Sequence, residues 1–82
     1  EAETLAREAV RLVRTSDEPD SQASALMDLG ETLVLVGKLR EAVPTFEEAI
    51  ALLEAKGNVV SATRARTRLA NLEVAAPGPA RL

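Results

Sequence analysis

The sequence predicts an all-α fold in which about four helices form antiparallel hairpins that stack as an α-solenoid. Apolar residues, mostly Ala, Leu and Val, recur at helical spacing. Gly, Pro and capping residues interrupt that spacing at regular intervals. The first half of the chain also recurs in the second half. With 82 residues and a single aromatic side chain, the chain is at most one small domain, with a core suited to close helix packing.

An internal repeat runs through the chain. The segment that begins at Glu1 recurs at Glu41, a separation of 40 residues. The identical pairs in this segment are Glu1 and Glu41, Ala2 and Ala42, Glu8 and Glu48, Ala9 and Ala49, and Leu12 and Leu52. The same separation later relates Ser21 to Ser61, Ala25 to Ala65, and Leu29 to Leu69. Because a chance match would not keep one separation throughout, we interpret the chain as helix-turn-helix repeats.

The first two helices are expected over residues 2–15 and 20–36. The expected apolar face of the first consists of Leu5, Ala9, Leu12 and Val13. The segment Ser-Asp-Glu-Pro-Asp at 16–20 ends this helix and starts the next, because it supplies capping side chains and a Pro suited to a first turn. The core face expected for the second helix consists of Leu26, Leu29, Leu33 and Val36. Gly37 is expected to form a left-handed cap at its end.

The third and fourth helices are expected over residues 39–56 and 59–73. The third ends at Gly57, and its inward residues are Ala42, Phe46, Ala49, Ile50 and Leu53. Pro44 lies inside it and removes one hydrogen bond, so a slight kink or a late helix start is expected. Asn58 is expected to cap the fourth helix, whose inward residues are Ala62, Ala65, Leu69 and Leu72. Residues 1–74 then form the repeat region, and residues 75–82, with two prolines flanking a glycine, are expected to be a flexible C-terminal tail.

The composition argues against most catalytic and metal chemistry. The chain has no Cys and no His, which removes thiol catalysis, disulfides and the commonest general base and metal ligand. Its 10 basic and 13 acidic residues argue against general nucleic-acid binding. No apolar run approaches the ~20 residues that span a bilayer. We therefore predict a cytoplasmic protein that is not an enzyme, with no cofactor, no metal and no direct contact with nucleic acid or membrane. Because the chain starts at Glu1 rather than Met, we expect a fragment or a processed piece.

The central segment resembles the tetratricopeptide repeat. The resemblance rests on Leu26-x2-Leu29-Gly30-x2-Leu33, followed by Ala42-x3-Phe46-x2-Ala49. In that pattern, small residues stand where two helix backbones approach closely, and Phe46 fills the gap between antiparallel helices. The resemblance implies stacked helical hairpins that bind a protein or a peptide. The period of 40 exceeds the family's usual ~34, with the excess at residues 15–22. Arg66 and Glu73 occupy the positions equivalent to Leu26 and Leu33, as expected of a solvent-facing terminal helix.

The longer period and residues 49–60 are also similar to the C-terminal helical repeats of large bacterial signalling ATPases. Those chains often combine such repeats with cyclase domains or with helix-turn-helix transcription-factor domains. This similarity implies that the parent protein is a bacterial signalling protein or transcriptional regulator. Nothing in the 82 residues encodes a cyclase or a DNA-reading helix.

Two groups of charged residues could form functional sites, but each is also explained as ordinary surface charge on amphipathic helices. The acidic group, Asp28, Glu31, Glu47, Glu48 and Glu54, could supply an acid/base pair, but outward charge is typical of amphipathic helices. The basic group, Arg7, Arg11, Arg14, Arg64, Arg66 and Arg68, could bind phosphate or an anionic partner. Helix ion pairs with Glu3 and Glu8 explain part of the basic group, and no aromatic residues interleave to stack bases.

The second helix has a face that packing within the repeat does not require. Its residues are Ser24, Met27, Asp28, Glu31, Val34 and Leu35. In the tetratricopeptide family, this face lines the concave groove that holds peptides. Either neighbouring helices cover the apolar members, or a truncated array leaves them bare, or they contact a partner or a second copy of the chain. We predict a protein- or peptide-binding module of a larger bacterial regulatory protein, and the alternative is a structural spacer or homodimerisation module.

Overall fold

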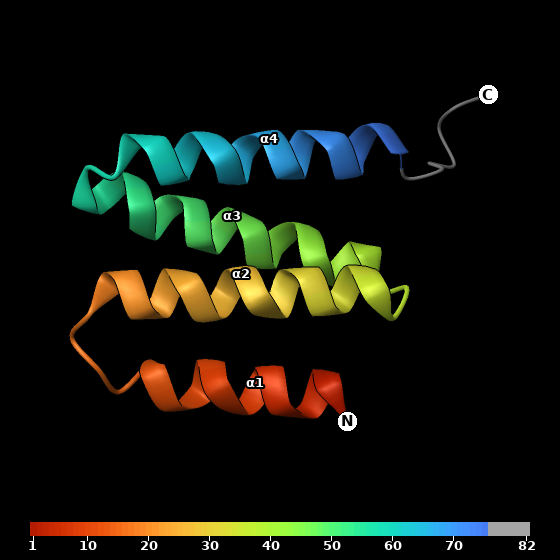
Figure 1. Ribbon diagram of the computed structural model, residues 1–82, viewed down its shortest axis with the longest axis horizontal. Helices are drawn as coiled ribbons and strands as arrows, with labels where there is room; N and C mark the ends of the chain where they lie inside the picture. The colour runs from red at the N-terminus through yellow and green to blue at the C-terminus, as the bar shows by residue number, and fades with distance from the viewer. Residues whose placement is uncertain (76–82) are drawn as a thin grey trace.

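A computed structural model describes residues 1–75, with side chains through Glu73. It contains the helices α1 (Ala2–Val13), α2 (Pro19–Leu35), α3 (Leu39–Lys56) and α4 (Val59–Ala75). Consecutive helices run antiparallel and lie side by side, and their connections alternate between the two ends of the molecule (Figure 1). No strand occurs within residues 1–75, so the predicted all-α fold of helical hairpins is confirmed.

The ends of the helices differ slightly from the predicted ones. Helix α1 ends two residues early at Val13, and α2 starts one residue early at Pro19. Helix α3 starts at Leu39 and contains Pro44, so the late start considered for it does not occur. Helix α4 continues through Ala75, where the tail was expected to begin. The remainder of the predicted tail, residues 76–82, lies outside the described residues.

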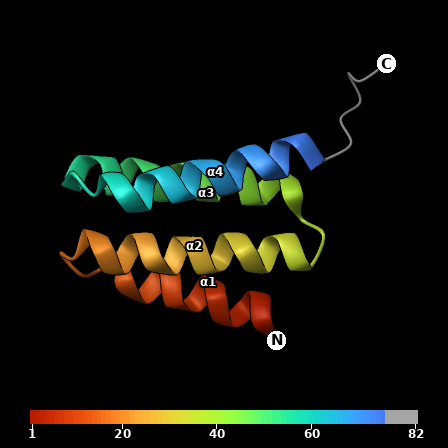
Figure 2. The ribbon, with the colours of Figure 1, turned by 45° about the horizontal axis from the view of Figure 1, so that its top comes forward.

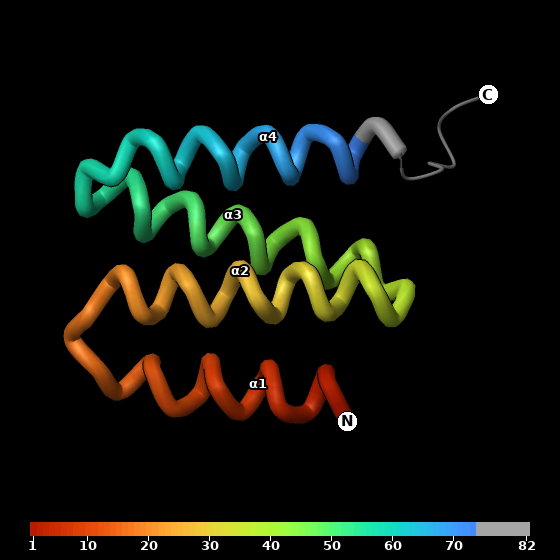
Figure 3. The backbone as a smooth tube through the Cα atoms, viewed as in Figure 1, coloured from red at the N-terminus to blue at the C-terminus, as the bar shows by residue number. Residues whose placement is uncertain are grey.

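The two short turns depend on glycine. Gly37 has φ +82° and Gly57 has φ +84°, in the left-handed region that side chains disfavour. After α2, the amide of Lys38 donates to the carbonyl of Leu33 at 2.8 Å, which closes the helix end as a Schellman motif. The backbone consequently reverses within two or three residues between α2 and α3 and between α3 and α4 (Figure 3). The left-handed cap predicted at Gly37 is confirmed, and Gly57 forms a second one.

Helices α2 and α3 form the main core as predicted. Phe46 is fully buried, and a Cβ built on Gly30 would lie only 2.7 Å from its Cζ atom. The ring therefore lies directly against the backbone of α2. The buried members of this cluster are Val10, Ala25, Leu26, Leu29, Leu33, Ala42, Phe46, Ala49 and Leu72.

The predicted core face of α1 is wrong in part. Leu5 and Leu12 are 70% and 57% exposed, and Ala9 is exposed as well. Instead Val10 is buried, with Ala6 and the predicted Val13 partly buried beside it. The apolar face of α1 is wider than one neighbouring helix can cover, and only its side toward α2 is covered within the described chain.

Val36 is also misplaced in the predicted core of α2. It is 48% exposed because the helix ends at Leu35 and Val36 forms its C-terminal cap.

A second cluster joins α2, α3 and α4. Its buried members are Ala23, Ile50, Leu53, Ala62 and Ala65. Three partly buried residues, Met27, Leu52 and Leu69, pack against both clusters. Figure 2 shows from a second direction that α4 lies along α3. The inward residues predicted for α3 and α4 thus lie in these clusters or against them.

Candidate functional site: a groove between α2 and α4

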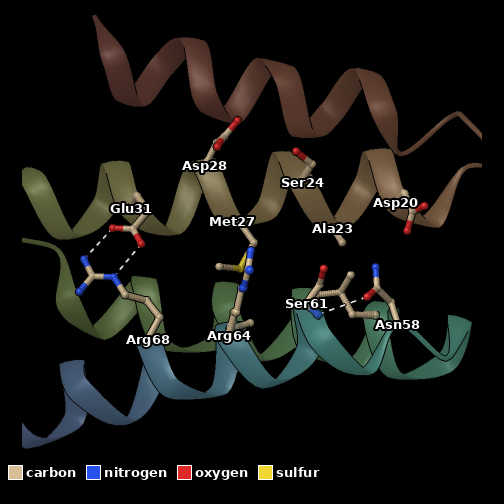
Figure 4. Close-up of a pocket in the computed structure, with 12 residues that line it drawn as sticks. Asp20, Ala23, Ser24, Met27, Asp28, Glu31, Asn58, Ser61, Arg64 and Arg68 are labelled. Atoms are coloured by element: carbon tan, nitrogen blue, oxygen red, sulfur yellow. Dashed lines mark hydrogen bonds and ion pairs between the residues drawn. The ribbon is translucent and has the colours of Figure 1, made fainter.

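A groove of about 470 Å³ lies between α2 and α4 (Figure 4). Its first wall consists of Asp20, Ala23, Ser24, Met27, Asp28 and Glu31 of α2. Its second wall consists of Asn58 together with Ser61, Arg64, Ala65 and Arg68 of α4. Leu53 of α3 contributes to the floor. Successive residues on each wall are one or three positions apart, so each helix contributes one stripe of its surface.

The floor of the groove is apolar and belongs to the second cluster. Ala23, Leu53 and Ala65 are buried, and Met27 is partly buried between the two clusters. Because these side chains pack against three helices, the floor is a fixed surface of the core rather than a loop that must order.

An ion pair joins the two walls at one end. Arg68 donates to both oxygens of Glu31, from Nε and from an Nη, each at 2.6 Å. These hydrogen bonds lower the pKa of the Glu31 carboxyl and raise the pKa of Arg68. The paired charges satisfy each other, so this end of the groove is nearly neutral at pH 7.

A second ion pair lies at the other end, where Lys56 of α3 donates to Asp20. Near it, the Oδ1 atom of Asn58 accepts from the amide of Ser61 at 3.2 Å, which confirms the predicted cap of α4. The charged residues at both ends of the groove therefore already have partners.

The middle of the groove differs, because Arg64 has no acidic partner. Within residues 1–73, its side chain makes neither an ion pair nor a hydrogen bond. Figure 4 shows Arg64 reaching from α4 toward Met27 of α2, where no carboxylate faces it. On the outer rim, the side chains of Ser24 and Asp28 point away from α4 (Figure 4). The carboxylate of Asp28 likewise has no ion-pair partner among the described side chains.

The six residues predicted for partner binding do not all lie together. The groove brings together Ser24, Met27, Asp28 and Glu31. Val34 is partly buried against the main core, which agrees with the alternative that neighbouring helices cover it. Leu35 is 86% exposed near the end of α2 and does not line the groove.

Sequence reasoning named Arg64 and Arg68 only within the basic group that could bind an anionic partner, and did not place them in one groove with the α2 residues. The signal for that placement was the 40-residue repeat, which relates Ser24 to Arg64 and Asp28 to Arg68. Equivalent positions on equivalent helices of a stacked repeat face the same side of the stack. Applying the separation to the candidate residues would have identified both arginines.

Several of the other charged residues form surface ion pairs. The predicted pair of Glu3 and Arg7 forms at 2.9 Å, and that of Glu8 and Arg11 forms as well. Arg7 and Arg14 also bridge α1 to α3, through Glu41 at 2.6 Å and Glu48 at 2.8 Å. Glu54, one of the acidic group, pairs with Arg66. Among the described residues, no group of three or more His, Cys, Asp or Glu could hold a metal ion.

Over residues 1–75, no helix combines the length and the apolar character that a membrane span requires.

Residues 1–55 match the sequence model of the tetratricopeptide repeat. The matched region contains α1, α2 and nearly all of α3, including the Gly30 and Phe46 contact. Comparison with curated proteins gave no match, and comparison with solved structures gave none.

Proposed function

Because this chain belongs to the tetratricopeptide repeat family, whose repeats are generally protein–protein interaction modules, we propose that it binds a segment of a partner protein in the groove between α2 and α4. The observation that carries this proposal is the form of the groove. It combines a buried apolar floor with polar walls, which is the usual construction of a recognition site. Its volume of about 470 Å³ lies within the range of small-ligand and peptide sites.

The groove supports an extended segment rather than a helix. At one end, the Glu31–Arg68 pair bridges the two walls and obstructs a wide ligand. A helix with its side chains is roughly 10–12 Å wide. An extended chain is narrower, and its alternate side chains can reach the two walls while its backbone and small residues lie over the apolar floor.

The test is a blocked groove. A random peptide library displayed on phage would supply ligands, and their affinities for the purified chain would be measured by fluorescence anisotropy. Ser61→Tyr places a ring in the groove and should abolish binding. Thr63→Tyr introduces the same side chain at an exposed position of α4 outside the lining and should leave binding unchanged. Equal binding by the two variants would rule out the groove as the site.

Self-association is the second candidate function, and the bare face of α1 favours it. Ala2, Leu5, Ala9 and Leu12 are exposed and spaced three, four and three residues apart. This is the spacing of a coiled-coil seam. If two copies of α1 pair antiparallel around residue 7, each Leu of one copy faces an Ala of the other, so large and small side chains alternate across the seam.

Light scattering over about a hundredfold range of concentration tests this candidate. A dimer that Leu5→Lys dissociates is the expected result. Leu35→Lys changes a still more exposed leucine outside α1 and serves as the control. A monomer at every concentration would eliminate self-association through α1.

We also propose that the module acts without catalysis, as the family does, inside a larger cytoplasmic regulatory protein of bacterial signalling. The similarity of residues 49–60 to the repeats of signalling ATPases supports the regulatory context. The coding sequence around this segment tests it. An adjoining ATPase, cyclase or DNA-binding domain is expected, and an unrelated enzyme domain would contradict the proposal.

A further inference from the structure

We propose that the groove selects an extended segment that carries an acidic side chain toward α4 and a basic side chain toward the outer rim of α2. The inference rests on the proposed function, because it names the ligand chemistry of the same groove. Charge complementarity carries it. The charges at the two ends of the groove are paired within the chain, whereas Arg64 and Asp28 have no ionic partner among the described residues.

Arg64 is the acid-recognising residue. A segment that covers the floor between Ala65 and Met27 also displaces water from the guanidinium that reaches across it. An uncharged segment leaves that cation with fewer hydrogen bonds than it had in water. A carboxylate replaces the lost water with charge-assisted hydrogen bonds, for which the planar guanidinium is well suited.

The α4 wall reinforces this preference. Its polar side chains include the Asn58 amide, the Ser61 hydroxyl and two guanidiniums, all of which can donate hydrogen bonds. The Oδ1 atom of Asn58 is already engaged by the Ser61 amide, which leaves its NH₂ group facing outward as a donor. Acceptor groups of the ligand therefore lie along α4.

The α2 rim has the opposite character. Asp28 is an exposed carboxylate, and Ser24 stands one helical turn before it on the same rim. A basic ligand side chain at this edge would pair with Asp28 without crossing the groove. The wall of donors and the rim of acceptors together orient the ligand.

The two edges also set the spacing of the ligand charges. Successive side chains of an extended chain point to opposite sides. An acidic and a basic residue that reach opposite edges are therefore adjacent or three residues apart. Two charged residues that are two positions apart reach the same edge. The groove thus distinguishes peptides of identical composition by the order of their residues.

The experiment uses synthetic peptides, acetylated and amidated so that they carry no terminal charge. One peptide places Glu and Lys three residues apart, a second of the same composition places them two apart, and a third replaces both with Gln. Fluorescence anisotropy with the full chain gives each Kd. The first peptide should bind about fivefold tighter than the other two, a modest factor because the groups are exposed.

A charge reversal tests the contact with Arg64. Arg64→Glu should remove the preference for the Glu-bearing peptide, and a peptide with Lys in place of that Glu should regain affinity for the variant. Arg40→Glu makes the same change at an exposed arginine outside the groove and should alter nothing.

A non-amidated form of the Gln peptide shows whether a terminal carboxylate substitutes for the acidic side chain. If this peptide bound more tightly than the Glu-bearing peptide, the assignment to a side chain would be overturned.

The outcomes separate this inference from the proposed function. One outcome is that all three peptides bind with equal affinity and that Ser61→Tyr abolishes this binding. That outcome would leave the groove as the site and overturn the charge selection. Equal affinities for the two Glu and Lys peptides, both tighter than the Gln peptide, would overturn the spacing. No binding by these peptides or by any displayed peptide would overturn the proposed function itself.

Discussion

The contact between Gly30 and Phe46 sets how closely α2 and α3 approach. A Cβ at Gly30 would lie 2.7 Å from the Cζ atom and 2.8 Å from the Cε1 atom of the ring. The ring is fully buried, so it has no solvent-facing position to move into. The main core therefore depends on the absence of a side chain at one residue.

Gly30→Ala should destabilise the chain by up to about 2 kcal/mol. Alanine favours a helix interior by about 1 kcal/mol over glycine, but overpacking a filled core costs about 1–3 kcal/mol. Urea unfolding followed by circular dichroism gives the free energy of unfolding. In a Phe46→Leu background, the added methyl group has more room, so the same substitution should cost less. A Gly30→Ala variant more stable than the parent would contradict this account.

Glu3 makes stability depend on pH in the acid range. Hydrogen bonds from Lys38 and Arg7 lower the pKa of its carboxyl below the ordinary value of 4.5. A carboxyl whose pKa is lower in the folded state stabilises the fold above its unfolded pKa, and this contribution disappears as the pH falls through the folded pKa. The stability difference between the parent and Glu3→Gln should be constant from pH 7 to about 5 and vanish well below 4.5. Urea unfolding across this range measures it, and a difference that grows on acidification would contradict the assignment.

Among the elements, α1 is held least firmly. Val10 is its only buried residue, and two exposed ion pairs from Arg7 and Arg14 reach α3. Exposed ion pairs contribute little, typically about 0–1 kcal/mol each. The attachment of α1 therefore depends mainly on the apolar contact of Val10, with the partly buried Ala6 and Val13 beside it.

Val10→Ala should release α1 selectively. Removing two buried methyl groups costs about 1–3 kcal/mol, which is large relative to the contacts of this helix. Amide hydrogen exchange should accelerate in α1 while protection in α2 and α3 is kept. Leu5→Ala, at a 70% exposed position of the same helix, is the control and should change little. Uniform acceleration through all helices would show instead that α1 unfolds with the rest.

Sequence patterns predicted the helices and turns better than the contacts between helices. The turns at Gly37 and Gly57 and the α2–α3 core follow from local backbone preference and helical periodicity, which the sequence carries directly. Periodicity gave α1 an apolar face but could not say which part of it α2 covers, so Leu5 was placed inward and Val10 was missed. The α4 wall of the groove required a tertiary relation, which only the 40-residue repeat encodes.

At the scale of the whole molecule, the groove is built directly on the hydrophobic core. Met27, Leu52 and Leu69 pack against both hydrophobic clusters, so the described parts of α2, α3 and α4 are linked through shared side chains. The floor of the groove is the solvent-facing side of the second hydrophobic cluster. We expect ligand binding to change the groove little, because its floor is already packed.

The most direct test of the central claim, that a partner segment lies between α2 and α4, is a titration of the ¹⁵N-labelled chain with the tightest displayed peptide. The account predicts that the largest amide shift changes follow the two facing stripes, around Met27 on α2 and around Ser61 and Arg64 on α4. Shift changes concentrated on α1 around Leu5 and Leu12, with the groove unaffected, would contradict it.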